Sequence, residues 1–125
     1  MSMNSELEFS LNSAKQTMKV VFGRSFAEEE KADSTRIKRE VNHAVQKIEP
    51  NVGQYTLFLE GRKLDTFPSS DLNHSKEFYE FYTQFKKTYL ILPTKKIASE
   101  QLKDTLKDCN MIDQYTIVDN FIGLE

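Results

Sequence analysis

The stretch YTLFLEGRKLDTF, residues 55–67, begins with an almost continuous run of apolar and β-favouring side chains. Such a run is typical of a strand that lies at the centre of a sheet or is covered on both faces. Gly61 can adopt the backbone angles of a tight turn, and RKLDTF can then run back beside the first strand until Pro68 stops regular pairing. The stretch therefore predicts a central strand followed by a β-hairpin.

Two segments upstream alternate apolar and polar side chains, which is the pattern of half-buried strands. The first is ELEFSLN and the second is QTMKVVFG, and their apolar positions are Leu7, Phe9 and Leu11, then Met18, Val20 and Phe22. Because the connection SAKQ is short and polar, we expect the two strands to form an antiparallel hairpin.

A helix is predicted between this hairpin and residue 50. Apolar side chains recur at helical spacing at Ile37, Val41, Ala44, Val45 and Ile48, and Pro50 marks the end. The helix can begin at Ser25, with Glu28 completing a capping box, or later at Asp33 or Ser34. In either case we expect residues 34–48 to pack against a sheet that contains Leu57 and Leu59.

The second half of the chain predicts two more helices and two more strands. SSDLNHSKEFYEFYTQFKK carries an aromatic stripe that is either core or a peptide-binding groove, formed by Phe78, Phe81, Tyr82 and Phe85. TYLILP then reads as a buried strand and QYTIVDNFI as a last strand. Between them, ASEQLKDTLKDCN reads as a helix whose inward side chains are Ala98, Leu102, Leu106 and Cys109.

The expected order is β-β-α-β-β-α-β-α-β, which indicates an α+β fold with helices packed on a mainly antiparallel sheet. A chain of 125 residues, 38% hydrophobic and 29% charged, suits one compact domain spanning residues 1–125.

The hairpin-helix-strand order of residues 6–60, followed by LFLEGRKLDTFPSSDL, resembles the ubiquitin-like β-grasp superfamily. The resemblance covers residues 6–93, with TYLILP as the closing strand, and leaves residues 94–125 as a C-terminal helix-strand extension. It implies an interaction domain rather than a transferable modifier, because FIGLE replaces a Gly-Gly tail. In Ras-binding members the second strand and first helix contact the partner, and here these segments carry Lys15, Lys19, Arg24, Arg36, Lys38 and Arg39.

The sequence shows no catalytic, metal or cofactor motif. His43 and His74 are far apart, and the chain has no Cys-x-x-Cys, His-Glu-x-x-His or Gly-rich phosphate loop. Ser69, Ser70 and Asp71 fit a turn and helix cap better than a nucleophile with its acid, and Cys109 fits a buried side chain better than a nucleophile. We expect no catalytic residues, no metal and no cofactor, and hence a protein that is not an enzyme.

Charge and hydropathy bear on location and partner. Seventeen basic and nineteen acidic side chains give a net charge of -2, which argues against binding of nucleic acid. The apolar runs are too short to span a membrane, the amino terminus has no signal-like core, and the one cysteine cannot form an internal disulfide. We therefore expect a cytoplasmic protein with no membrane contact.

These observations favour a protein-protein interaction module whose partner is another protein. The basic residues expected to contact that partner are Lys19, Arg36, Lys38, Arg39, Arg62 and Lys63. An alternative is a small inhibitor, such as an immunity or anti-defence protein, that presents acidic groups at residues 28–30 or at Asp104 and Asp108 to a basic enzyme cleft. A third hypothesis is an RNA-binding domain, which would need Tyr55 and Phe58 exposed on its strands.

Overall fold

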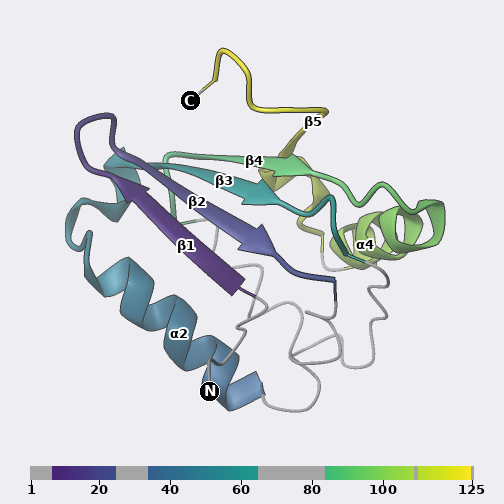
Figure 1. Cartoon of the computed structure of the whole chain (residues 1–125), viewed down its shortest axis with the longest axis horizontal. Helices are drawn as coiled ribbons and strands as arrows, with labels where there is room; N and C mark the ends of the chain where they lie inside the picture. The colour runs from purple at the N-terminus through teal and green to yellow at the C-terminus, as the bar shows by residue number, and fades with distance from the viewer. Residues whose placement is uncertain (1–6, 25–33, 65–83, 109, 125) are drawn as a thin grey trace.

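The computed structural model describes residues 7–24, 34–64, 84–108 and 110–124 (Figure 1). In these ranges the strands are β1 (Leu7–Asn12), β2 (Thr17–Phe22), β3 (Thr56–Glu60), β4 (Lys87–Ile91) and β5 (Thr116–Val118). The helices are α2 (Ser34–Gln46) and α4 (Lys96–Asp108), and short 3-10 turns at Asn51–Gln54 and Ile112–Gln114 lead into β3 and β5.

The described strands form one sheet in the order β1-β2-β3-β4-β5. β1 and β2 are antiparallel, as the hairpin prediction required, whereas β2, β3, β4 and β5 all run parallel. Each parallel step needs a crossover, and right-handed crossovers that all step in one direction place their helices on one face of the sheet. Accordingly α2 lies below β1 and β2 in Figure 1, and Leu102 and Leu106 of α4 belong to the same core cluster as Val41 and Val45 of α2.

The main core lies between this face of the sheet and the two helices. It unites buried side chains of the strands with Val41, Ala44 and Val45 of α2 and with Leu102 and Leu106 of α4. The sheet's contribution to this layer includes Met18, Val20, Leu57, Leu59 and Leu90. The prediction that helix 34–48 packs on Leu57 and Leu59 is therefore confirmed for Val41, Val45 and Ile48, while the side chain of Ile37 lies outside the described part.

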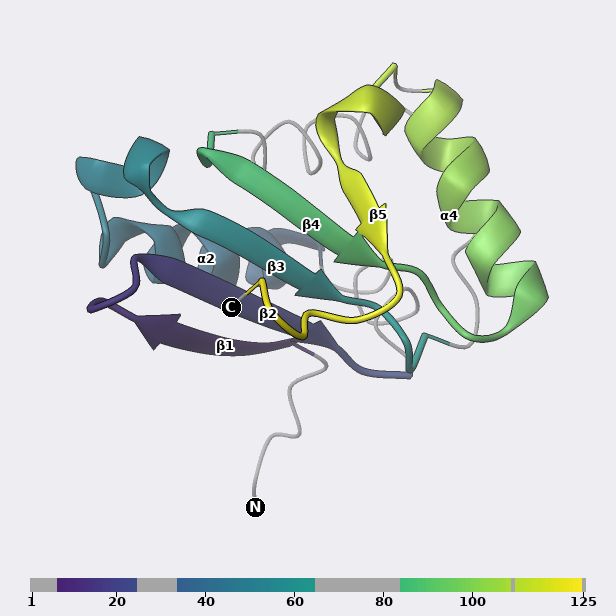
Figure 2. The same cartoon turned by 90° about the horizontal axis from the view of Figure 1, so that it is seen from above.

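The opposite face of the sheet has a smaller apolar cluster. Phe58, Ile91 and Phe121 are buried there, with Tyr89 and Val118 packed against them. Segment 119–124 follows β5 and crosses this face over β4 and β3 (Figure 2). β3 is thus covered on both faces, which explains why its sequence is apolar at three consecutive positions.

The expectation of a mainly antiparallel, β-grasp-like sheet is wrong, because only the β1–β2 pair is antiparallel. The hairpin expected after Gly61 is also wrong. β3 has β2 along one edge and β4 along the other, so both of its hydrogen-bonding edges are occupied and no returning strand can pair with it. Residues 62 and 63 form a turn instead, and the rest of the expected strand, residues 65–67, lies outside the described part.

Gly61 is required for a different reason from the one its sequence context suggests. It has no positive φ angle, but its N–H donates to the carbonyl oxygen of Ile91 at 3.0 Å. A Cβ at position 61 would lie 2.7 Å from that same oxygen, closer than real Cβ atoms approach backbone oxygens. Glycine therefore permits the close approach of the two chains just after β3.

The remaining core predictions have mixed outcomes. Ala98, Leu102 and Leu106 are buried on α4, as predicted, whereas Cys109 lies outside the described part. Of the aromatic stripe, Phe85 is buried in the main core, and residues 78, 81 and 82 are outside the description. The last strand is shorter than QYTIVDNFI, because β5 ends at Val118.

Replacing Val41 by aspartate should unfold the domain. Val41 is buried between α2 and the sheet, and an unpaired buried carboxylate costs several kcal/mol against a domain stability of about 5 to 15 kcal/mol. Thermal unfolding followed by circular dichroism measures the effect, with Asn42→Asp on the exposed side of the same helix as control. An unchanged melting temperature for Val41→Asp would remove α2 from the core.

Replacing Gly61 by alanine should lower the free energy of unfolding by about 1 to 3 kcal/mol, because β3 and β4 must separate to admit the methyl group. Gly53→Ala is the matched control, since a Cβ there meets nothing closer than the Gln84 carbonyl at 4.0 Å. Urea denaturation compares the two variants. Equal stabilities would show that the contact at Ile91 is not tight.

Candidate functional site

The carboxyl ends of parallel strands meet at one edge of a sheet, where open α/β sheets commonly bind ligands. Here the segments that follow β2, β3 and β4 line an open pocket of about 660 Å³. We call it the carboxyl-edge pocket. It is lined by Arg24, Glu60, Arg62, Lys63, Leu64, Thr94 and Lys95. Four of these seven side chains are cationic and one is acidic, so the pocket is basic although the chain as a whole carries a net charge of -2.

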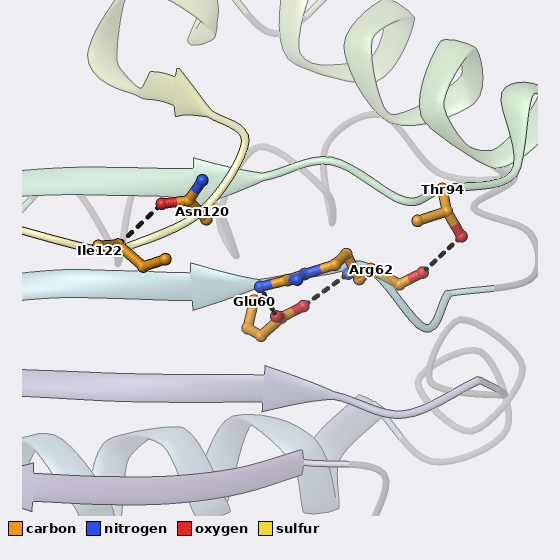
Figure 3. A network of polar contacts seen from close by, with 5 residues as sticks. All are labelled: Glu60, Arg62, Thr94, Asn120 and Ile122. Carbon is orange, nitrogen blue, oxygen red and sulfur yellow. Dashed lines mark hydrogen bonds and ion pairs between the residues drawn. The ribbon is translucent and has the colours of Figure 1, made fainter.

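Glu60 and Arg62 are joined by two polar contacts in the pocket (Figure 3). One carboxylate oxygen of Glu60 accepts a hydrogen bond from the backbone N–H of Arg62 at 2.8 Å, and the other pairs with Nη2 of Arg62 at 2.8 Å. The side chain of Glu60 is 15% exposed and that of Arg62 is 47% exposed. Glu60 therefore fixes the turn after β3 and holds one guanidinium group at the mouth of the pocket.

Thr94 connects the turn after β3 to the segment between β4 and α4. Its backbone N–H and its hydroxyl group both donate to the carbonyl oxygen of Arg62, each at 3.3 Å (Figure 3). Because Gly61 is also bonded to Ile91, the two segments are tied at successive positions. The cations at residues 62, 63 and 95 are thus carried on backbone that is held in place.

The six residues predicted to bind a partner do not form one surface. Arg62 and Lys63 lie together in the carboxyl-edge pocket. Lys19 lies on the face of the sheet opposite the helices, where its Nζ is 5.7 Å from the ring centre of Phe121. The remaining three are on α2, in the helical layer: Arg36, Lys38 and Arg39.

On α2 the basic residues differ in their surroundings. Arg36 pairs with Glu40 one turn later at 3.2 Å, a partly exposed i, i+4 contact of the kind that stabilises a helix only slightly. Arg39 and His43 line a shallow hollow of about 460 Å³ with Thr35, Asn42 and Gln46. The side chain of Lys38 lies outside the described part. The helix thus offers a second polar surface, with fewer cations than the carboxyl-edge pocket.

Chemical groups in the described ranges do not assemble into a metal centre. No cluster of three or more His, Cys, Asp or Glu side chains occurs among the residues that the structure places. His43 is exposed on α2, and His74, Ser69, Ser70 and Asp71 are outside the description. Within the same ranges, no helix combines the length and the apolar character that crossing a bilayer requires.

Sequence reasoning missed four members of the pocket, which are Glu60, Leu64, Thr94 and Lys95. A signal for them was present, since each lies at or just after the end of an apolar strand. Strands that alternate with helices after residue 24 indicate parallel pairing, which brings such ends together. An antiparallel sheet would place the ends of neighbouring strands at opposite edges, so the antiparallel prediction did not indicate a shared pocket.

The third hypothesis required exposed Tyr55 and Phe58, but both side chains are buried. Phe58 is covered by Phe121, with ring centres 4.8 Å apart. The two aromatic groups on which that hypothesis depends are thus not presented to solvent in this structure.

Comparison of the chain with protein-family models, curated protein sequences and solved structures gives no significant match. The relationship to the ubiquitin-like superfamily therefore stays a prediction.

Proposed function

We propose that this protein is a non-enzymatic interaction module that binds an acidic surface of another protein through the carboxyl-edge pocket. The observation that carries the proposal is the convergence of four cationic side chains, Arg24, Arg62, Lys63 and Lys95, from three segments of the chain. Two of them, Arg62 and Lys63, are residues for which the sequence already predicted partner contact.

A cluster of like charges favours a partner with clustered carboxylates. Long-range attraction accelerates encounter, and like-charged partners are rejected at the same surface. Arginine adds geometric selectivity, because its planar group binds a carboxylate through two parallel hydrogen bonds. The acidic net charge of the whole chain limits this attraction to the pocket, which supports a protein partner over a long nucleic acid.

Pre-organisation supports the proposal as well. The carboxylate of Glu60 holds Arg62 at both its backbone and its guanidinium group, and Thr94 holds the Arg62 carbonyl. A binding surface whose backbone is fixed in advance loses less conformational entropy when the partner docks.

The inhibitor hypothesis gains less from the described residues. Its acidic candidates Asp104 and Asp108 lie on α4 next to Lys103 and Lys107, and residues 28–30 are outside the description. We include a cytoplasmic location in the proposal, for which the support is a single cysteine that cannot form an internal disulfide.

Reversing two charges of the pocket should weaken partner binding without unfolding the protein. Lys63→Glu/Lys95→Glu leaves the Glu60–Arg62 contact intact, and both lysines are exposed. A partner captured by the wild-type protein should bind this variant about tenfold or more weakly, mainly through slower association, and its binding to wild type should fall with added salt.

The matched control is Lys47→Glu/Lys86→Glu, which makes the same change in net charge at exposed positions after α2 and before β4, outside the carboxyl-edge pocket. Biolayer interferometry at two salt concentrations measures both variants. An equal loss in both variants would indicate a general charge effect, and no loss in the pocket variant would place the interface elsewhere.

A further inference from the structure

Segment 119–124 lies on the sheet face opposite the helices and is anchored there by a single large side chain. Phe121 is only 4% exposed, whereas its neighbour Ile122 is 86% exposed and Leu124 is also exposed. The segment lies over the sheet in both views (Figures 1 and 2). Because one ring supplies the buried contact, opening of this segment should require far less free energy than unfolding the domain.

The seat of Phe121 is built from side chains that the parallel register aligns. Phe58 of β3 and Tyr89 of β4 lie directly opposite each other, and their rings stack at 5.4 Å with an interplanar angle of 13°. Phe121 meets Phe58 edge to face, at 4.8 Å and 63°, and Ile91 completes the apolar floor. We call Phe58, Tyr89 and Ile91 the aromatic seat.

Two lysines flank the aromatic seat. Lys19 is opposite Phe58 in the β2–β3 register, and its Nζ lies 5.7 Å from the ring centre of Phe121. Nζ of Lys87 lies 5.1 Å from the ring centre of Tyr89. Both distances are within the range of cation-π attraction. The seat therefore favours an aromatic ring that is accompanied by negative charge.

The segment that occupies the seat is shaped by local hydrogen bonds. The Asn120 side-chain oxygen accepts a bond from the Ile122 N–H at 2.9 Å, and the Leu124 N–H donates to the Phe121 carbonyl at 3.0 Å. Gly123, at φ +81°, supplies the left-handed residue of the second turn. Since these bonds are internal, a short peptide of similar sequence can adopt the same shape without the rest of the chain.

We propose that the aromatic seat is a docking site for a short acidic-aromatic peptide of a partner protein, and that segment 119–124 occupies it until that peptide displaces it. The segment itself shows the required chemistry, with Asp119 two residues before the anchoring Phe121. This inference rests on the proposed function only in taking the partner to be a protein.

A peptide fits the seat better than single-stranded nucleic acid does. The seat receives the edge of one ring, whereas bases need open faces on which to stack, and Phe58 is only 1% exposed.

The test uses a fluorescein-labelled peptide of residues 119–125, DNFIGLE, and the full chain carrying Phe121→Ala. In wild type the tethered segment competes at an effective concentration of about millimolar, so the labelled peptide should bind Phe121→Ala at least about tenfold more tightly. Ile122→Ala is the matched control, because its side chain is exposed and its loss should leave binding at the wild-type level. A peptide with alanine in place of phenylalanine should bind neither variant.

A second measurement needs no variant and decides the matter if Phe121→Ala unfolds. Unlabelled peptide added to ¹⁵N-labelled wild type should shift the Gly123 amide signal in a dose-dependent way as segment 119–124 leaves the sheet. An unmoved Gly123 signal at millimolar peptide, or a cooperatively folded Phe121→Ala that binds an oligouridylate but not the peptide, would overturn the proposal.

Failure here is distinguishable from failure of the carboxyl-edge pocket. Lys63→Glu/Lys95→Glu should bind the DNFIGLE peptide as its wild-type parent does, because neither lysine contributes to the aromatic seat. Loss of peptide binding in that variant would contradict a separate seat. Partner binding that depends on Lys63 and Lys95, without any peptide binding by Phe121→Ala, would overturn the seat alone.

Discussion

The parallel pairing of β3 with both of its neighbours is the constraint on which the rest of the structure depends. With β2 on one edge and β4 on the other, β3 can be reached and left only through crossovers. Those crossovers step in one direction and place α2 and α4 on one face of the sheet. The same pairing gathers the carboxyl ends of three strands at one edge, where the basic pocket lies, and leaves the other face to segment 119–124.

Close contact just after β3 converts this arrangement into a defined site. Gly61 allows its own backbone to approach Ile91, and the next residue, Arg62, is then fixed by Glu60 and Thr94. The apolar packing of the sheet and the position of a surface cation are linked through three consecutive residues. A change that widened the β3–β4 spacing would for this reason also alter the pocket.

Local patterns in the sequence predicted most elements correctly, because amphipathic spacing reflects which side chains a helix or strand buries. Val41 and Val45 of α2 and Leu102 of α4 were identified in this way. The direction of β3 relative to its neighbours was not predicted correctly. An apolar run such as LFL looks the same in a parallel and in an antiparallel strand when the strand is covered on both faces. Gly61 strengthened the error, because a close approach and a turn both require glycine.

The candidate sites were predicted only in part, because their residues come together through strand pairing and a chain reversal rather than through local sequence patterns. Arg62 and Lys63 stood out as exposed cations after a strand, but Lys95 joins them only through the parallel register. Phe121 was assigned to the last strand, although Asp119 and Asn120 before it and Gly123 after it are turn residues. Its seat on Phe58 depends on a chain reversal that no periodicity encodes.

The geometry of the two proposed surfaces suggests how one partner would use both. β5 ends at the same edge of the sheet as β3 and β4, where Val118 aligns with Ile91 and Ile91 with Glu60, so segment 119–124 starts near the carboxyl-edge pocket. A partner segment with several carboxylates and one aromatic residue would therefore meet lysines and arginines at the edge and the aromatic seat on the adjacent face. Contacts joined on one peptide act at a high effective concentration for each other. Weak attraction at the exposed pocket would then raise the local concentration of the aromatic group enough to compete with Phe121.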